Sequence, residues 1–190
     1  MPRISQATRE ITCKLVYCGP VRSGKSTNLR YLQGRARPAH RTGVSASLSW
    51  SGDFLSLDAG PVAGFVTRFQ LYAVPGAGPC VATRRLILQG VDGVIFVADS
   101  QARRFDDNLA SLRGLEEDLD RLGKSVPQIP LVVQYNKQDL PAELILSPAD
   151  LANGFEADAL PGVPADALHG GGVFETFTLL SGLVLRQFHE

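Results

Sequence analysis

Residues 19–26 read Gly19-Pro20-Val21-Arg22-Ser23-Gly24-Lys25-Ser26, the pattern G-x-x-x-x-G-K-S of a phosphate-binding P-loop. A strand-like apolar run precedes the motif at residues 11–17, and a run with helical spacing begins near Thr27. Glycines permit backbone angles that let successive N–H groups converge on an anion at the start of a helix. A chance glycine-rich turn is the alternative, but it does not explain the strand and helix on either side.

In a P-loop the lysine reaches the β- and γ-phosphates, and the serine hydroxyl binds Mg²⁺. Lys25 and Ser26 are therefore the expected phosphate and metal ligands of this chain. The residues predicted to surround the phosphates are Gly19, Val21, Arg22, Ser23, Gly24, Lys25, Ser26 and Thr27.

The bulk composition is that of one globular domain over residues 1–190. The chain has 190 residues and 44% hydrophobic content, enough for a sizeable core. Its 19 basic and 19 acidic residues balance. A balanced charge gives no reason to expect nucleic acid or an anionic membrane as a partner.

Cysteine usage and hydropathy favour a cytoplasmic protein. Cys13 and Cys18 lie five apart on one predicted strand, so they point to opposite faces and are not placed to pair. Together with Cys80 they are expected to be free thiols in a reducing compartment. The chain shows no signal peptide, membrane-spanning apolar run or lipidation motif, so we expect no direct membrane anchor.

Alternating strand and helix patterns predict an α/β domain with a mostly parallel sheet. Expected buried strands cover residues 11–18, 91–98 and 129–134, and a weaker strand covers 163–168. Helical spacing predicts helices at 27–33, 84–88, 106–122, 148–152 and 173–188, with Gly34 ending the first. Segments 53–58 and 65–74, separated by a turn at 60–64, predict a hairpin that adds one antiparallel edge strand. Ligands of such sheets bind at the carboxyl ends of the strands, where the P-loop lies.

A second motif, Asn136-Lys137-Gln138-Asp139, follows the third buried strand. The Asp139 carboxylate can accept two N–H bonds from guanine, which adenine cannot supply in that geometry. The Lys137 stem can stack on the base, and Asn136 can brace the loop. Alone, the motif also fits a surface turn. Its place about 110 residues after the P-loop, in the expected strand order, favours guanine recognition and argues against an ATPase or kinase.

The two motifs together resemble those of Ras-like small GTPases. Finer features resemble one bacterial branch, the MglA-like polarity GTPases. They are Arg9-Glu10-Ile11, Tyr17-Cys18-Gly19-Pro20, Thr27-Asn28-Leu29, Gly64-Phe65-x-Thr67-Arg68-Phe69, Val74-Pro75-Gly76, Arg85-Leu86-Ile87-Leu88, residues 90–100, Gln134-Tyr135-Asn136-Lys137-x-Asp139-Leu140-Pro141 and Gly172-Val173-Phe174-Glu175-Thr176.

The resemblance covers roughly residues 9–188. It implies a Ras-like P-loop GTPase fold, with a mostly parallel six-stranded sheet, one antiparallel edge strand and helices on both faces. It also implies binding of GTP or GDP with Mg²⁺, with backbone contact to the base through Ala167 or Leu168. A cytoplasmic role in cell polarity or motility and a roadblock-type (MglB-like) regulator follow from the same resemblance.

Several positions depart from the family pattern. The family's switch I carries an arginine followed by a threonine, but residues 44–51 here read Val44-Ser45-Ala46-Ser47-Leu48-Ser49-Trp50-Ser51. Ala77 stands where the family has the glutamine after Val-Pro-Gly, and Val21 replaces the usual third glycine of the P-loop. Ala73 replaces the first aspartate of D-x-x-G, which MglA-like proteins also lack.

These departures predict slow hydrolysis. An arginine finger is worth about 10³–10⁵ in rate, and both it and the glutamine act chiefly in the transition state. No catalytic residue is therefore assigned. A partner's arginine in trans, or recruitment of Arg22 or Arg41, is the alternative source of charge. The rival function is a catalytically inactive pseudo-GTPase that acts as a binding scaffold.

Overall fold

The structure is a computed structural model that describes residues 3–35, 53–62, 64–75, 81–125, 128–157 and 159–187. The strands are β1 (Arg3–Ser5), β2 (Glu10–Cys18), β3 (Phe54–Val62), β4 (Phe65–Ala73), β5 (Gly93–Asp99), β6 (Leu131–Asn136) and β7 (Gly162–Pro164). The helices are α1 (Lys25–Arg35), α2 (Val81–Leu88), α3 (Phe105–Arg121), α4 (Pro148–Gly154) and α5 (Val173–Arg186), with short 3-10 turns η1 (Ala102–Arg104) and η3 (Ala142–Leu144).

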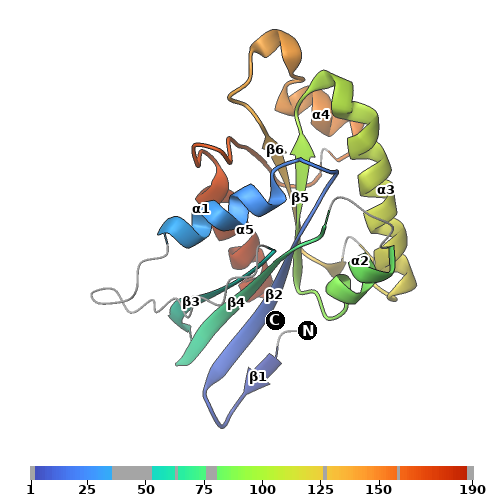
Figure 1. Cartoon of the computed structure of the whole chain (residues 1–190). Helices are drawn as coiled ribbons and strands as arrows, with labels where there is room; N and C mark the ends of the chain where they lie inside the picture. Colours follow the sequence, from blue (N-terminus) through green and yellow to red (C-terminus); the bar gives the residue numbers. More distant parts are fainter. Residues whose placement is uncertain are drawn as a thin grey trace.

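The strands of this part of the chain form one sheet in the order β3-β4-β2-β5-β6-β7 (Figure 1). Strand β2 is central, because it pairs in parallel with both β4 and β5. The β3–β4 hairpin supplies the expected antiparallel edge. The mostly parallel α/β class predicted from the sequence is confirmed.

The predicted number of strands is wrong by one. Among the residues that the structure describes, the sheet has seven strands, because β1 pairs antiparallel with the first residues of β2, with Ile4 opposite Ile11. Strand β5 begins to pair with β2 only at Leu15, so the first part of that edge of β2 is open to β1. The short, polar β1 segment carries too little hydrophobic alternation to be found by pattern.

Helices cover both faces of the sheet, and each face has its own buried cluster. One cluster joins alternate β2 residues such as Cys13 to α1 and α5, and the other joins Cys18 to α2, α3 and α4. The two cysteines therefore point to opposite faces, as their spacing predicts, and both are free. Burial raises the pKa of each thiol to about 12, which keeps them protonated and unreactive.

Two expected chain breaks lie inside regular elements instead. Helix α1 continues through Gly34 to Arg35, because Gly34 does not adopt the positive φ with which a glycine commonly ends a helix. Strand β3 continues through Gly60 and Pro61 to Val62, with an irregularity in register between Asp58 and Pro61. A proline is tolerated there because β3 is an edge strand, where its missing N–H costs no ladder bond.

The length and hydropathy of the described helices show whether any of them could cross a membrane. None of them combines the length and the apolar character that crossing a bilayer requires.

Candidate functional site

The P-loop connects the end of β2 to the start of α1, and its two motif glycines are both sterically required. Gly19 has φ +136°, and a Cβ there would lie 2.2 Å from the carbonyl oxygen of Val97 on β5. Gly24 has φ +106°, and a Cβ there would lie 2.2 Å from Nδ2 of Asn136. The loop therefore packs so closely against β5 and against the segment after β6 that no side chain fits at either position.

Lys25 is the first residue of α1, and its ammonium is folded back into the loop. Its Nζ donates hydrogen bonds to the carbonyl oxygens of Gly19, at 2.9 Å, and Pro20, at 2.6 Å. The residue is only 5% exposed. Burial lowers the pKa of this lysine from 10.5 to about 8, with the nearby Asp53 carboxylate acting in the opposite direction. A phosphate arriving here would meet a poorly solvated cation that gains much from a new counter-charge.

Ser26 lies beside an acidic residue that sequence reasoning did not select. Its Oγ donates a 2.8 Å hydrogen bond to Oδ1 of Asp53, which directly precedes β3. Two oxygen ligands held this close suit a hard cation such as Mg²⁺. The backbone oxygen of Asp53 accepts a hydrogen bond from the N–H of Ala73. Ala73 stands where D-x-x-G would place its aspartate. The Asp53 carboxylate is therefore supplied by the residue that is hydrogen-bonded to that position.

Asn136 ends β6 and joins two loops. Its Nδ2 donates to the carbonyl oxygen of Ser23 at 2.7 Å, and its Oδ1 accepts from the N–H of Ala167 at 2.9 Å. The motif predicts that the asparagine braces the loop, and Asn136 does so through these two hydrogen bonds. It also uses the Ala167 amide, so this N–H is already engaged within the protein.

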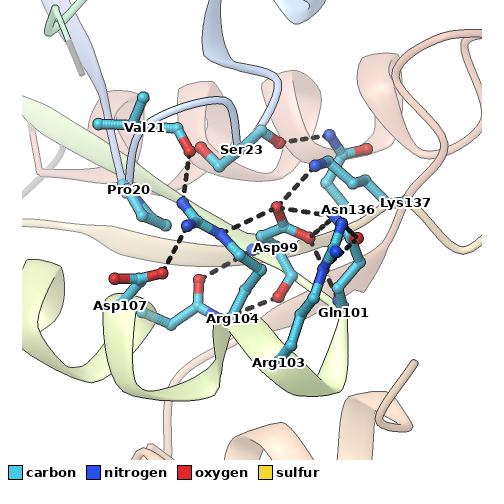
Figure 2. A network of polar contacts seen from close by, with 12 residues as sticks. Pro20, Val21, Ser23, Asp99, Gln101, Arg103, Arg104, Asp107, Asn136 and Lys137 are labelled. Carbon is cyan, nitrogen blue, oxygen red and sulfur yellow. Dashed lines mark hydrogen bonds and ion pairs between the residues drawn. The ribbon is translucent and has the colours of Figure 1, made fainter. Parts of the chain in front are cut away.

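Lys137 and the P-loop are linked by a buried carboxylate (Figure 2). Asp99, at the end of β5 and 1% exposed, accepts a hydrogen bond from Nζ of Lys137 at 2.6 Å. Arg104 lies with its Nε 3.7 Å from the same carboxylate and donates from Nη2 to the carbonyl oxygen of Val21 at 2.8 Å. Asp107 pairs with the other side of this guanidinium, at 2.5 Å. Arg104, the residue before α3, thus contacts the P-loop directly and reaches Lys137 only through Asp99.

Two adjoining cavities open at this edge of the sheet. The larger, about 590 Å³, is lined by Val21, Arg22, Gly24, Lys25, Ser26, Thr27, Asp53, Val74 and Pro75. The smaller, about 190 Å³, is lined by Arg22, Gly24, Thr27, Asn136, Lys137, Asp139, Leu140, Ala167 and Leu168. Their shared residues are Arg22, Gly24 and Thr27. One continuous depression therefore joins the P-loop to the second motif.

Most predicted site residues line these cavities. The exceptions are Gly19 and Ser23, which belong to the loop's framework: Gly19 carries a carbonyl that binds Lys25, and Ser23 is fully buried. Leu168 is 70% exposed at the rim, and its N–H binds Oδ1 of Asp166. His169 lies outside both linings and contacts Asp166. The switch I segment 43–52, Ala77 and Cys80 lie outside the described residues.

Three residues of the site were missed from the sequence in different ways. Asp53 could have been found from the sequence, because it lies at the start of the first strand of the predicted hairpin. That strand runs antiparallel to its neighbour, so it begins at the edge of the sheet where the parallel strands end. Asp99 ends the buried strand β5, but nothing in the sequence around it indicates a role for its carboxylate. Arg104 carries no motif signal, since its contact with Val21 joins residues 83 apart in sequence.

Comparison with known proteins agrees with this geometry. No protein-family model matches the chain. The chain is 42% identical over 196 residues to the Mutual gliding-motility protein MglA of Myxococcus xanthus (strain DK1622), and the alignment covers 100% of this chain and 99% of that protein. An identity this high over the whole length, together with the α/β fold and the two motifs, means that the chain belongs to the MglA family of Ras-like small GTPases.

Proposed function

We propose that this chain binds GTP and GDP, with the phosphates in the larger cavity and the guanine base in the smaller one. The observation that carries the proposal is the junction of the two cavities at Arg22, Gly24 and Thr27. A phosphate-binding loop and a base-binding loop at the two ends of one depression suit a nucleotide lying across both. Asp139 lines the base end, where its carboxylate can accept from guanine N1 and the 2-amino group.

The test of this proposal is nucleotide selectivity. We expect the protein to bind a fluorescent GDP analogue at least about 100-fold more tightly than the ADP analogue, because adenine leaves the Asp139 carboxylate without donors. Competition titration with unlabelled GDP, ADP and guanosine measures both the base and the phosphate contributions. Equal affinity for GDP and ADP would contradict the assignment of the smaller cavity.

Ser26 and Asp53 are the residues that would hold Mg²⁺. Both contribute hard oxygen atoms at the phosphate end of the larger cavity, which fits a cation that retains several waters and binds substrate phosphates. When bound, the ion neutralises charge on the nucleotide phosphates. The carboxylate of Asp53 would take the place of the aspartate that Ala73 cannot supply.

Replacing Asp53 by Asn should weaken the response to Mg²⁺ without removing nucleotide binding. We expect the Mg²⁺ concentration that half-maximally slows GDP release to rise about tenfold, since an amide is a weaker ligand than a carboxylate for a hard cation. Stopped-flow release of the fluorescent GDP analogue across a Mg²⁺ series measures this. Asp58 provides the matched control, because its carboxylate pairs with Arg68 and lines neither cavity. Equal Mg²⁺ dependence in the Asp53→Asn and native proteins would remove Asp53 from the proposed metal site.

Hydrolysis is expected to be slow in the isolated protein. The described site supplies binding groups, whereas the sequence has Ala77 at the water-orienting position and no arginine between residues 43 and 52. We expect single-turnover GTP cleavage below about 10⁻³ s⁻¹, the range of a Ras-like protein that lacks a finger. A rate above about 10⁻² s⁻¹, typical of an arginine supplied in cis, would contradict this expectation.

The nucleotide that copurifies separates a slow switch from the rival pseudo-GTPase scaffold. GDP in the purified protein supports a working cycle. GTP that persists through purification supports a protein locked in one state, and an empty protein supports a pseudo-GTPase with weakened affinity. We favour the slow switch, because Lys25, Ser26 and the second motif are all in place around the cavities.

The cellular role proposed here rests on the family. The relative from Myxococcus xanthus is named for gliding motility. We infer that this chain is a cytoplasmic, single-domain switch over residues 1–190 that regulates cell polarity or motility. Its proposed regulator is a roadblock-type (MglB-like) protein. Binding of such a protein to the GTP-loaded form in preference to the GDP-loaded form, measured by calorimetry, tests the proposal.

A further inference from the structure

Arg22 has an unusual backbone for an arginine. It occupies the fourth position of the P-loop with φ +62°, in the left-handed region. An L side chain there is strained relative to glycine. Non-glycine residues held in this region concentrate at ligand sites, where the surrounding structure fixes them.

The backbone on each side of Arg22 is held by a different element. The carbonyl oxygen of Val21 accepts a 2.8 Å hydrogen bond from Arg104, and the carbonyl oxygen of Ser23 accepts a 2.7 Å hydrogen bond from Asn136 (Figure 2). The first contact comes from the start of α3 and the second from the end of β6. The point from which the Arg22 side chain leaves the loop is therefore fixed before any ligand arrives.

Arg22 is also the charged residue that the two cavities share. The other shared residues, Gly24 and Thr27, carry no charge. A guanidinium at this junction lies between the space around Lys25 and the space around Asp139. In a nucleotide that spans both cavities, that junction is where the phosphate chain meets the nucleoside.

The Arg22 side chain differs from the two lysines of the site in its contacts. The Lys25 ammonium donates to two carbonyl oxygens, and the Lys137 ammonium is paired with Asp99. Arg22 is exposed, and within the described part of the chain its side chain makes no hydrogen bond or ion pair. Its N–H donors are thus free to bind phosphate oxygens, for which a planar guanidinium is well suited.

We propose that Arg22 contacts the bound nucleotide, with its guanidinium on the phosphate oxygens nearest the ribose, and that this contact slows the release of GDP and GTP alike. The proposal rests on the proposed function, because it presumes a guanine nucleotide across the two cavities. The proposal adds a charged side-chain contact to the nucleotide, besides the contacts made by the backbone N–H groups of the P-loop. GDP and GTP share the phosphates in question, so the effect should not depend on the γ-phosphate.

The test compares Arg22→Gln, Arg22→Lys and Arg22→Gly with a control, Arg30→Gln. Arg30 is an exposed arginine of α1 that lines neither cavity. Release of fluorescent GDP and GTP analogues from the Mg²⁺-loaded protein is followed by stopped flow at low and high ionic strength. We expect Arg22→Gln to release both nucleotides about tenfold faster, the size of one lost charge-assisted contact. Arg22→Lys should recover part of the loss, and Arg30→Gln should match the native protein.

Two further readouts separate the loss of charge at Arg22 from a defect in folding. Arg22→Gly relieves the left-handed strain, so it should unfold at no lower temperature than the native protein while still releasing nucleotide about tenfold faster. Salt should accelerate release from the native protein more than from Arg22→Gln, because screening acts on the charge that the variant lacks.

Three outcomes would overturn the proposal. In the first, the Arg22 variants release both nucleotides at the native rate. In the second, release is unchanged but GTP cleavage falls, which would place the guanidinium at the γ-phosphate. In the third, the native protein binds no guanine nucleotide, which would reject the proposed function as well; the first two outcomes leave that function standing.

Discussion

Replacing Lys25 by Met is expected to lower the affinity for GDP by about 100-fold. The ammonium is nearly buried in the loop, where its alternative partners are two carbonyl oxygens rather than water. A phosphate oxygen that replaces them adds a charge-assisted hydrogen bond in a poorly solvated site, each such bond being worth about 1.5–3 kcal/mol. Methionine keeps most of the length and apolar stem and removes the charge, so competition titration reports on the ammonium.

Guanosine provides the control for this variant. It has no phosphates, so its affinity should be the same for the native protein and for Lys25→Met. A loss of guanosine binding of similar size would show that the variant disturbs the whole site. A GDP affinity within threefold of the native value would contradict the assigned role of Lys25.

The pH dependence of the native protein gives a second readout of the same lysine. Burial lowers the pKa of Lys25 to about 8 in the empty protein, and bound phosphates should raise it again, so GDP binding takes up a proton above pH 8. Affinity for GDP should therefore fall as the pH rises above about 8, and Lys25→Met should lose this dependence. For stability the sign is opposite. The unfolded chain binds more protons than the folded one between pH 8 and 10.5, so the free energy of unfolding of the empty protein should rise across that window.

Replacing Asp139 by Asn is expected to change the preferred base. Guanine N1 and its 2-amino group both donate, and an amide oxygen with an adjacent NH₂ group cannot accept from both. Two charge-assisted hydrogen bonds are lost or inverted, so GTP affinity should fall by about 100-fold or more. Xanthine carries a carbonyl oxygen where guanine has its 2-amino group, so the amide NH₂ can donate to it. Xanthosine triphosphate should then bind Asp139→Asn more tightly than it binds the native protein.

Asp120→Asn is the matched control for this exchange. Asp120 is an exposed acid of α3 outside both cavities, so the variant changes net charge equally and should keep the native base preference. Parallel titrations of both variants with the guanine and xanthine nucleotides distinguish base recognition from a general charge effect. If Asp139→Asn kept its preference for GTP over xanthosine triphosphate, the smaller cavity would not be the base site.

Much of the fold was predictable because its signals are local. The P-loop follows its strand and opens its helix as the motif requires, and strands β5 and β6 are buried throughout and mostly apolar. The helix expected at Ser147-Pro148 begins there with a capping box, in which Ser147 and Asp150 bind each other's backbone N–H. Strand β1 escaped prediction, because it pairs with β2 through backbone bonds that ask little of its side chains.

The sequence by itself determined the MglA-like identity, the two nucleotide-binding motifs and the departures at Val21 and Ala77, because each depends on residue type at a fixed spacing. Only the tertiary structure placed Asp53 against Ser26, Arg104 against Val21 and Asp99 against Lys137. These contacts join residues 27, 83 and 38 positions apart. They depend on which strands are neighbours and on the register of their ends. The sheet topology determines which strands are neighbours and how their ends align, and neither can be predicted from a local sequence pattern.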